Sequence, residues 1–69
     1  MQILVVFEKV GDSYSAYSPD LPGCVATGES REETAANMHQ ALELHVQGMI
    51  EEGEPIPDSA SFAEVMVIA

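Results

Sequence analysis

The chain has 69 residues, with 12 acidic side chains against 2 basic ones and a formal net charge of −10 at pH 7. Nucleic-acid backbones are neutralised by lysine and arginine, so Lys9 and Arg31 alone argue against direct nucleic-acid binding by one copy. An anionic membrane surface would repel the chain as well. The natural complement of this charge is a basic protein, although solubility alone explains it equally well.

The length indicates one domain over residues 1–69. A core of this size seldom contributes more than ~3–5 kcal/mol of net stability, and disulfides, metals or oligomerisation usually add to it. A single cysteine, Cys24, excludes an internal disulfide, and two histidines without a cysteine cluster give no zinc pattern. We therefore expect no metal and no cofactor, and we expect a homo-oligomer, a dimer or higher.

The start of the chain does not have the pattern of a secretory signal. It lacks a basic first region, and the apolar run beginning at Ile3 ends at Glu8-Lys9. No apolar stretch approaches the ~18–20 residues that a membrane span needs. Together with the single cysteine, this predicts a cytoplasmic protein in a reducing compartment.

The first half of the chain predicts three strands. Residues 3–10 are β-branched and apolar on both faces, which is typical of a central strand covered on both sides. Gly11-Asp12 suits a two-residue hairpin turn, so residues 14–18 should pair antiparallel with the first strand. Pro19 to Gly23 interrupts the ladder, and residues 24–27 resume a strand.

The second half predicts one long helix over residues 31–52. Ser30 and Glu33 form a capping box at its start, and Gly53 followed by Pro55 marks its end. One face is predicted to be buried: Ala35, Met38, Ala41, Leu42, His45, Val46, Met49 and Ile50. The opposite face is predicted to be exposed to solvent; its residues are Glu32, Ala36, His39, Glu43, Gln47 and Glu51.

Residues 62–69 predict a last strand, apolar on both faces after Glu64. A right-handed crossover through the helix would place this fourth strand parallel to the first, giving an α+β fold of β-β-β-α-β type with sheet order 3-2-1-4. One helix covers only one face of such a sheet. The uncovered apolar face, or an edge, is therefore expected to associate with another chain.

The residues between the second strand and the helix carry a resemblance to a known family. The pattern YxAxxPDLPGCxxxGxSxxE over residues 14–33, followed by Ala36-Asn37 and by GEPIP at 53–57, closely resembles HicB-like antitoxins. The resemblance covers about residues 1–69 and implies a partial ribonuclease-H-like fold. Its structural positions here are Tyr14, Ala16, Pro19, Pro22, Gly23, Gly28, Ser30, Glu33 and Asn37.

The resemblance also implies a function. Members of the family neutralise a small basic HicA toxin, an mRNA-cleaving protein, by covering its RNA-binding and catalytic surface, which makes this chain an expected type II antitoxin. Many members carry a C-terminal DNA-binding domain that residues 1–69 lack, so a short form without direct operator binding is expected.

Five carboxylates are candidates for contact with a basic partner. Glu51, Glu52 and Glu54 crowd the helix C-terminus, where the helix dipole prefers cations. A cationic partner would relieve them, although a solvated end whose repulsion is screened by salt accounts for them as well. Asp20 lies in the stiff loop, where capping of its own turn backbone is favoured over contact with a partner. The candidate partner-binding residues are Asp20, Glu29, Glu43, Glu51 and Glu52.

Alternatives to a toxin-binding function remain open at this point. A stand-alone oligomeric scaffold or small-ligand-binding module of the same fold would have the same pattern. A metal nuclease would need a carboxylate cluster, but the middle of the first strand is Leu4 to Phe7 and the last strand offers only Glu64. Ser15, His45 and Asp20 have no pattern that orders them as a triad, and Cys24 is expected to be a small buried hydrophobe. We therefore expect no enzymatic activity.

Overall fold

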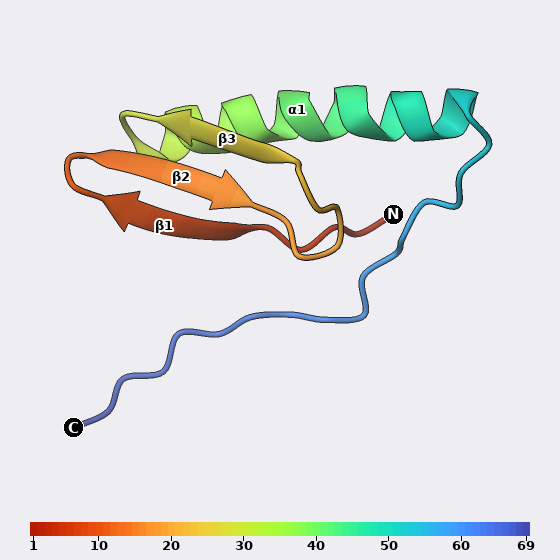
Figure 1. The fold of residues 1–69 in the computed structure, drawn as a ribbon. Coiled ribbons are helices and arrows are strands. Elements are labelled where there is room, and N and C mark those ends of the chain that lie inside the picture. The colour runs from red at the N-terminus through yellow and green to blue at the C-terminus, as the bar shows by residue number, and fades with distance from the viewer.

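A computed structural model describes residues 1–69 and shows an antiparallel meander followed by one helix (Figure 1). The elements are β1 (Val6–Val10), β2 (Ser13–Tyr17), β3 (Val25–Gly28) and α1 (Arg31–Glu51). The sheet has the order β1-β2-β3, and α1 covers one of its faces. The predicted α+β class, meander and long helix are confirmed. No helix of the structure is both long enough and apolar enough to cross a membrane.

The β1–β2 hairpin turns at Gly11, whose φ of 60° suits glycine, and Val10 pairs with Ser13 across it. The first strand begins at Val6, three residues later than predicted. The cause lies at Leu4, whose N–H donates to Asp20 Oδ2 at 2.8 Å and whose carbonyl accepts from Ser18 Oγ at 2.7 Å. Because side chains satisfy both backbone groups of Leu4, the ladder is not needed there.

The junction between β3 and α1 is closely packed. Ser30 caps the helix, as predicted, by accepting from the Glu33 amide at 3.0 Å. Thr34 is fully buried, and its hydroxyl donates to the Ser30 carbonyl at 2.7 Å. A Cβ atom on Gly28 would lie 2.6 Å from Thr34 Oγ1 and 2.8 Å from the Thr34 backbone nitrogen. The glycine is therefore required by the first turn of α1 rather than by an unusual φ.

Replacing Gly28 with alanine is expected to lower the free energy of unfolding by about 1–3 kcal/mol, because the new methyl group must displace helix backbone. Urea titration followed by circular dichroism measures the change. Gly48 is the matched control, since a Cβ there has nothing within 4 Å and the position is inside α1. Gly48→Ala should raise stability by roughly 0.5–1 kcal/mol. Equal effects at both positions would contradict the close approach at Gly28.

The core is small, and α1 packs mainly over β2 and β3. Its buried apolar residues are Ala16, Leu21, Cys24 and Met38. Ala41, Leu42, Val46 and Met49 are half-buried against this core, as the helix pattern predicts. The pattern is wrong at Ala35, His45 and Ile50, which are exposed.

Lengths explain part of this difference. A helix of 21 residues is about 32 Å long, whereas strands of five residues span about 17 Å. The C-terminal half of α1, with His45 and Ile50, therefore extends beyond the sheet (Figure 1). Ala35 is exposed for another reason, because it faces the side of β1 that α1 leaves uncovered.

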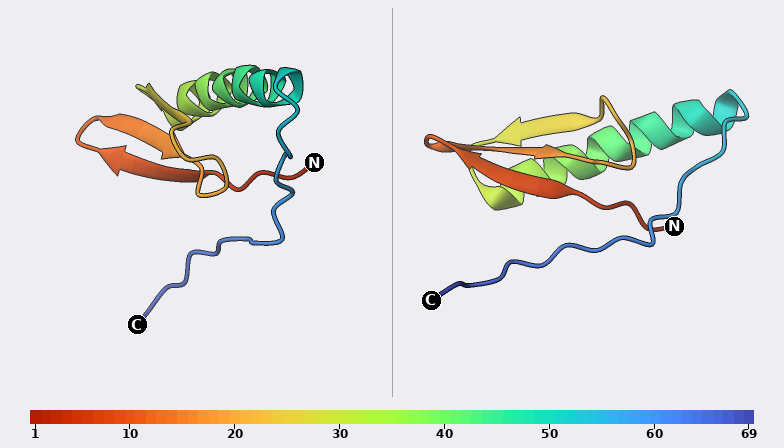
Figure 2. Two further views of the ribbon diagram at one scale, coloured as in Figure 1. Left: turned by 45° about the vertical axis from the view of Figure 1, so that its right-hand side comes forward. Right: turned by 60° about the horizontal axis from the view of Figure 1, so that its bottom comes forward.

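The predicted fourth strand is not formed. Residues 53–69 follow α1 without a helix or strand, and residues 60–69 run apart from the sheet with all side chains exposed (Figures 1 and 2). β1 is consequently an edge strand and not the central strand that its sequence predicts. Because α1 lies over β2 and β3, a strand beside β1 would have little cover from the helix of its own chain.

The sheet face away from α1 carries neighbouring apolar side chains. Val6, Tyr17 and Val25 are register partners across the three strands. They lie on the face opposite Ala16, which is buried under the helix, because successive side chains of a strand alternate between faces. Tyr17 and Val25 are exposed, so the uncovered apolar face expected from the sequence is present.

Candidate functional site

A groove of about 500 Å³ lies where the loop between β2 and β3 meets the C-terminal end of α1. Its lining combines apolar residues with two carboxylates. It is built from three separate stretches of the chain. The lining residues are Asp20, Leu21, Pro22, His45, Met49, Glu54, Pro55, Ile56 and Pro57.

The first wall is the loop of residues 18–24, which side-chain hydrogen bonds hold in place. Ser18 is buried and its hydroxyl bonds both the Leu4 carbonyl and the Asp20 amide, the latter at 3.2 Å. Gly23, at φ 88°, allows a tight turn that brings the Cys24 amide to 3.1 Å from the Leu21 carbonyl. The loop is therefore a fixed wall, with Leu21 buried beneath it.

The second wall is the end of α1, which closes with a pair of backbone bonds. The Gly53 amide donates to the Ile50 carbonyl at 3.1 Å, and the Glu54 amide donates to the Met49 carbonyl at 2.9 Å. This is a Schellman motif, and Gly53 has the positive φ of 71° that it requires. The motif turns the chain back so that Glu54 and the half-buried Ile56 line the groove.

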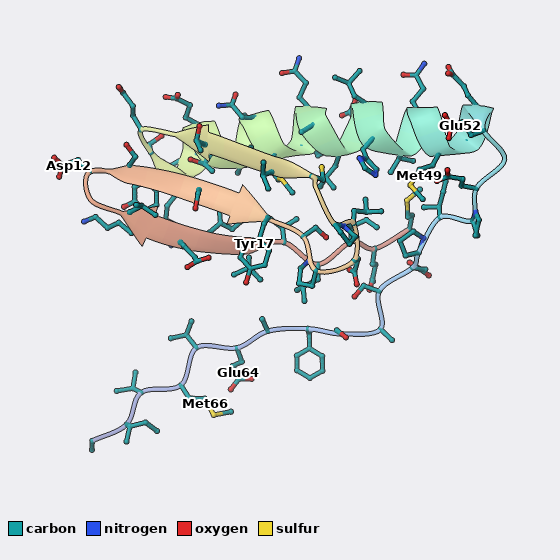
Figure 3. The ribbon with its side chains drawn as sticks, viewed as in Figure 1. Asp12, Tyr17, Met49, Glu52, Glu64 and Met66 are labelled. Carbon is teal, nitrogen blue, oxygen red and sulfur yellow. The ribbon has the colours of Figure 1, made fainter.

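Acidic side chains predominate at this end of the molecule, which has no lysine or arginine. Asp20 and Glu54 line the groove, and Glu51 and Glu52 are exposed immediately beside it, as Figure 3 shows for Glu52 and Met49. The last turn of α1 has no basic residue. The C-terminal end of a helix also carries a partial negative charge, so the groove attracts cations.

The structure separates the predicted partner-binding residues into two groups. Asp20, Glu51 and Glu52 lie at the groove end. Glu29 lies before the start of α1, roughly 30 Å away along a 21-residue helix. Glu43 lies between them and pairs with His39 at 2.7 Å on the exposed face. Only the first three could belong to one small contact region.

Asp20 has a structural role that the sequence did not reveal. It is half-buried, and its Oδ2 atom caps the Leu4 amide sixteen residues earlier. The sequence favoured a role for Asp20 in capping the backbone of its own turn. The carboxylate does accept a hydrogen bond from a backbone amide, but from that of Leu4 and not from one in the turn. The sequence placed Glu54 at the acidic helix end but not among the candidate partner-binding residues, and it gave no sign that Ile56 lines a groove, although the GEPIP stretch that contains both was part of the resemblance.

Cys24 and His45 show no arrangement for nucleophilic catalysis. Cys24 is buried, as expected, and burial raises the pKa of its thiol above the ordinary value. The thiol is therefore neutral at neutral pH and a poor nucleophile. His45 and Asp20 both line the groove, whereas Ser15 lies in β2 and does not. No group of three or more His, Cys, Asp or Glu side chains is placed to hold a metal ion.

A three-stranded meander, one helix over its face and an acidic groove at the helix end define a small acidic α+β protein. The chain belongs to the HicB-like antitoxins of bacterial toxin-antitoxin systems, whose family model matches residues 3–68. The resemblance noted in the sequence is thereby confirmed.

Several relatives share most of this chain. An uncharacterised 14.9 kDa protein of Haemophilus phage HP1 is 38% identical over 55 residues, which are 80% of this chain but 41% of the phage protein. A UPF0150 protein of Synechocystis is 39% identical over 54 residues, covering 77% of this chain and 68% of its own. This chain therefore spans about two fifths of the phage protein's length and about two thirds of the cyanobacterial one.

A solved structure shares the fold. A chain of a HicA3 and HicB3 toxin-antitoxin complex superposes with a TM-score of 0.68. The match covers 88% of this chain and 72% of that chain, at 24% sequence identity. The meander-plus-helix arrangement is thus a fold found in a toxin-antitoxin complex.

Proposed function

We propose that residues 1–69 act as one antitoxin domain of a type II toxin-antitoxin system. The domain binds a small basic HicA-like toxin and neutralises it by covering the surface with which the toxin binds and cleaves mRNA. The observation that carries this proposal is the acidic groove at the end of α1, on a chain of net charge −10. The family and the fold found in a HicA3 and HicB3 complex support it.

The groove suits the side chain of a lysine or arginine. The apolar residues Met49 and Ile56 can pack against the methylene groups of such a side chain. Asp20 and Glu54 can then accept charge-assisted hydrogen bonds from its cationic head. Such residues are abundant on RNA-binding surfaces, so occupying them removes the toxin's means of holding RNA.

Charge also favours rapid association. Two oppositely charged surfaces are steered together at rates that fall steeply with ionic strength. The chain has only Lys9 and Arg31 to oppose this attraction, and neither lines the groove. The same charge leaves one copy unsuited to direct contact with DNA or RNA.

Titration of the protein with a purified HicA-like basic protein tests the proposal. We expect a complex at low ionic strength, measured by isothermal titration calorimetry, whose affinity falls at least tenfold between about 50 and 500 mM NaCl. A basic protein of unrelated fold serves as the control and should bind far more weakly. Absence of a complex at low ionic strength, or equal affinity for both basic proteins, would contradict the proposal.

A second candidate function is a self-associating scaffold without a toxin. The apolar row of half-buried Val6 and exposed Tyr17 and Val25 favours it, because soluble monomers rarely expose large contiguous apolar patches. Oligomerisation and toxin binding use different surfaces here and are compatible. The titration described above separates them, because a scaffold forms no complex with the toxin at any ionic strength.

A further inference from the structure

The outer edge of β1 has unpaired backbone groups. In a two-residue hairpin the flanking residues form a hydrogen-bonded pair, here Val10 with Ser13. Hydrogen-bonded pairs then recur at every second residue, so Phe7 and Lys9 direct their N–H and C=O groups away from β2. No strand occupies that side of the sheet. Such an edge can accept a further strand.

An apolar cleft of about 280 Å³ lies along this edge, between β1 and the helix. It exists because α1 packs over β2 and β3 and leaves β1 uncovered. Phe7 is partly exposed as a result. Aliphatic and aromatic side chains from both walls line the cleft, mainly Ile3, Val5, Phe7, Ala35, Met38 and Leu42.

The same chain carries a segment with the properties this edge requires. Residues 60–69 are extended and unpaired, and Phe62, Val65 and Val67 are 85%, 94% and 92% exposed. Figure 3 shows Glu64 and Met66 among the side chains along this segment, well separated from the sheet. Glu64 is its single charged residue, and Lys9, the chain's one lysine, lies in β1.

The segment begins beside its own N-terminal residues but cannot continue along them. The Ser59 amide donates to the Gln2 carbonyl at 2.7 Å, and the Gln2 amide donates to Asp58 Oδ1 at 2.6 Å. In a parallel ladder the next bond would join the Leu4 amide to the Ser59 carbonyl. The Leu4 amide is already bonded to Asp20. The pairing therefore stops at Ser59, and the chain departs from the sheet (Figure 2).

We propose that residues 60–69 of one copy occupy the β1 edge and the β1–α1 cleft of a second copy, in a reciprocal exchange. A segment from another chain enters the edge without the Gln2–Ser59 contact that fixes the register within one chain. Each chain has one such segment and one such edge. In a dimer with a two-fold axis, the segment of each copy therefore fills the β1 edge of the other. The exchange buries apolar side chains that are exposed in the single chain and completes the sheet beside β1.

Self-association of this kind has a distinctive salt dependence. Two chains of net charge −10 repel each other, so screening by salt should tighten the dimer. Binding to a basic toxin should weaken under the same change. The proposed exchange does not depend on the proposed binding of a toxin, so an experiment can contradict one proposal and leave the other standing.

Hydrogen–deuterium exchange of the unmodified protein tests the proposal. We expect protection of the amides of residues 63–68 to rise at least tenfold with protein concentration across the range in which sedimentation shows a change from 7.4 kDa to twice that mass. Protection independent of concentration would mean docking within one chain and would overturn the proposal. A dimer in which these amides stay unprotected would overturn it as well.

Matched substitutions give a second test. Val67→Asp places a charge in the exchanged segment, and Gln47→Glu adds the same charge on the exposed face of α1. We expect Val67→Asp to weaken dimerisation at least thirtyfold and Gln47→Glu to weaken it less than threefold, with unchanged circular dichroism of the monomers. Equal effects of the two substitutions would overturn the exchange.

Discussion

Replacing Met38 with alanine is expected to leave the chain largely unfolded at room temperature. Met38 is 1% exposed and is the largest fully buried side chain of the four-residue apolar core. Truncating a buried methionine to alanine costs about 2–5 kcal/mol, because it removes apolar contacts and leaves a cavity. That range matches the ~3–5 kcal/mol that a core of this size supplies. Urea titration followed by circular dichroism measures the loss.

Leu44 provides the control for Met38. It lies in the same helix, but its side chain is 67% exposed. Leu44→Ala should therefore change the free energy of unfolding by no more than about 0.5 kcal/mol. A loss at Met38 that is no larger than the loss at Leu44 would show that this core does not hold the fold together.

Reversing two charges beside the groove should weaken toxin binding by roughly 100-fold. Glu52→Lys with Glu54→Lys leaves Asp20 and Glu51 balanced by two lysines, so the groove end loses its net negative charge. Losses of about 2–5 kcal/mol are common when a closely paired interfacial charge is removed, and 100-fold corresponds to about 2.7 kcal/mol. Calorimetric titration with the HicA-like protein measures the affinity.

The matched control for this reversal is Glu29→Lys with Glu32→Lys at the opposite end of α1. It changes the net charge by the same amount, so any effect of overall charge is equal in the two variants. The control should lower affinity by less than tenfold. If both variants lose affinity equally, net charge and not the groove determines binding. Asp20 is left intact in both, because its carboxylate caps the Leu4 amide.

The local elements of the fold were predictable because their determinants are local. Gly11 sets the hairpin, Ser30 caps the helix through the Glu33 amide, and Gly53 ends it. The prediction of a fourth strand was wrong, because a strand forms only where a second strand is available to pair with it. The apolar pattern of residues 62–69 reports that these side chains should be buried, but not against which surface. Where α1 rests on the sheet depends on packing between distant residues, which no local pattern reports.

The candidate site could be predicted only in part. Glu51 and Glu52 stood out because carboxylates at a helix C-terminus oppose the dipole, and they do lie at the groove. Glu54 stood out for the same reason, but its place in the groove together with Ile56 was missed, because the Schellman motif that directs both residues depends on three-dimensional geometry. The bond from Asp20 to Leu4 joins residues sixteen positions apart, which sequence spacing alone does not indicate.

The positions of the two cations have a consequence for how the molecule meets a partner. Lys9, near the hairpin turn, and Arg31, at the start of α1, lie at one end of the elongated body, and the groove lies at the other (Figure 1). The two cations offset part of the acidic charge at the hairpin end, whereas no lysine or arginine offsets it at the groove, so negative charge increases toward the groove, in the same sense as the dipole of α1. A positively charged body diffusing nearby exerts a torque on this molecule and turns its groove end forward before the surfaces touch.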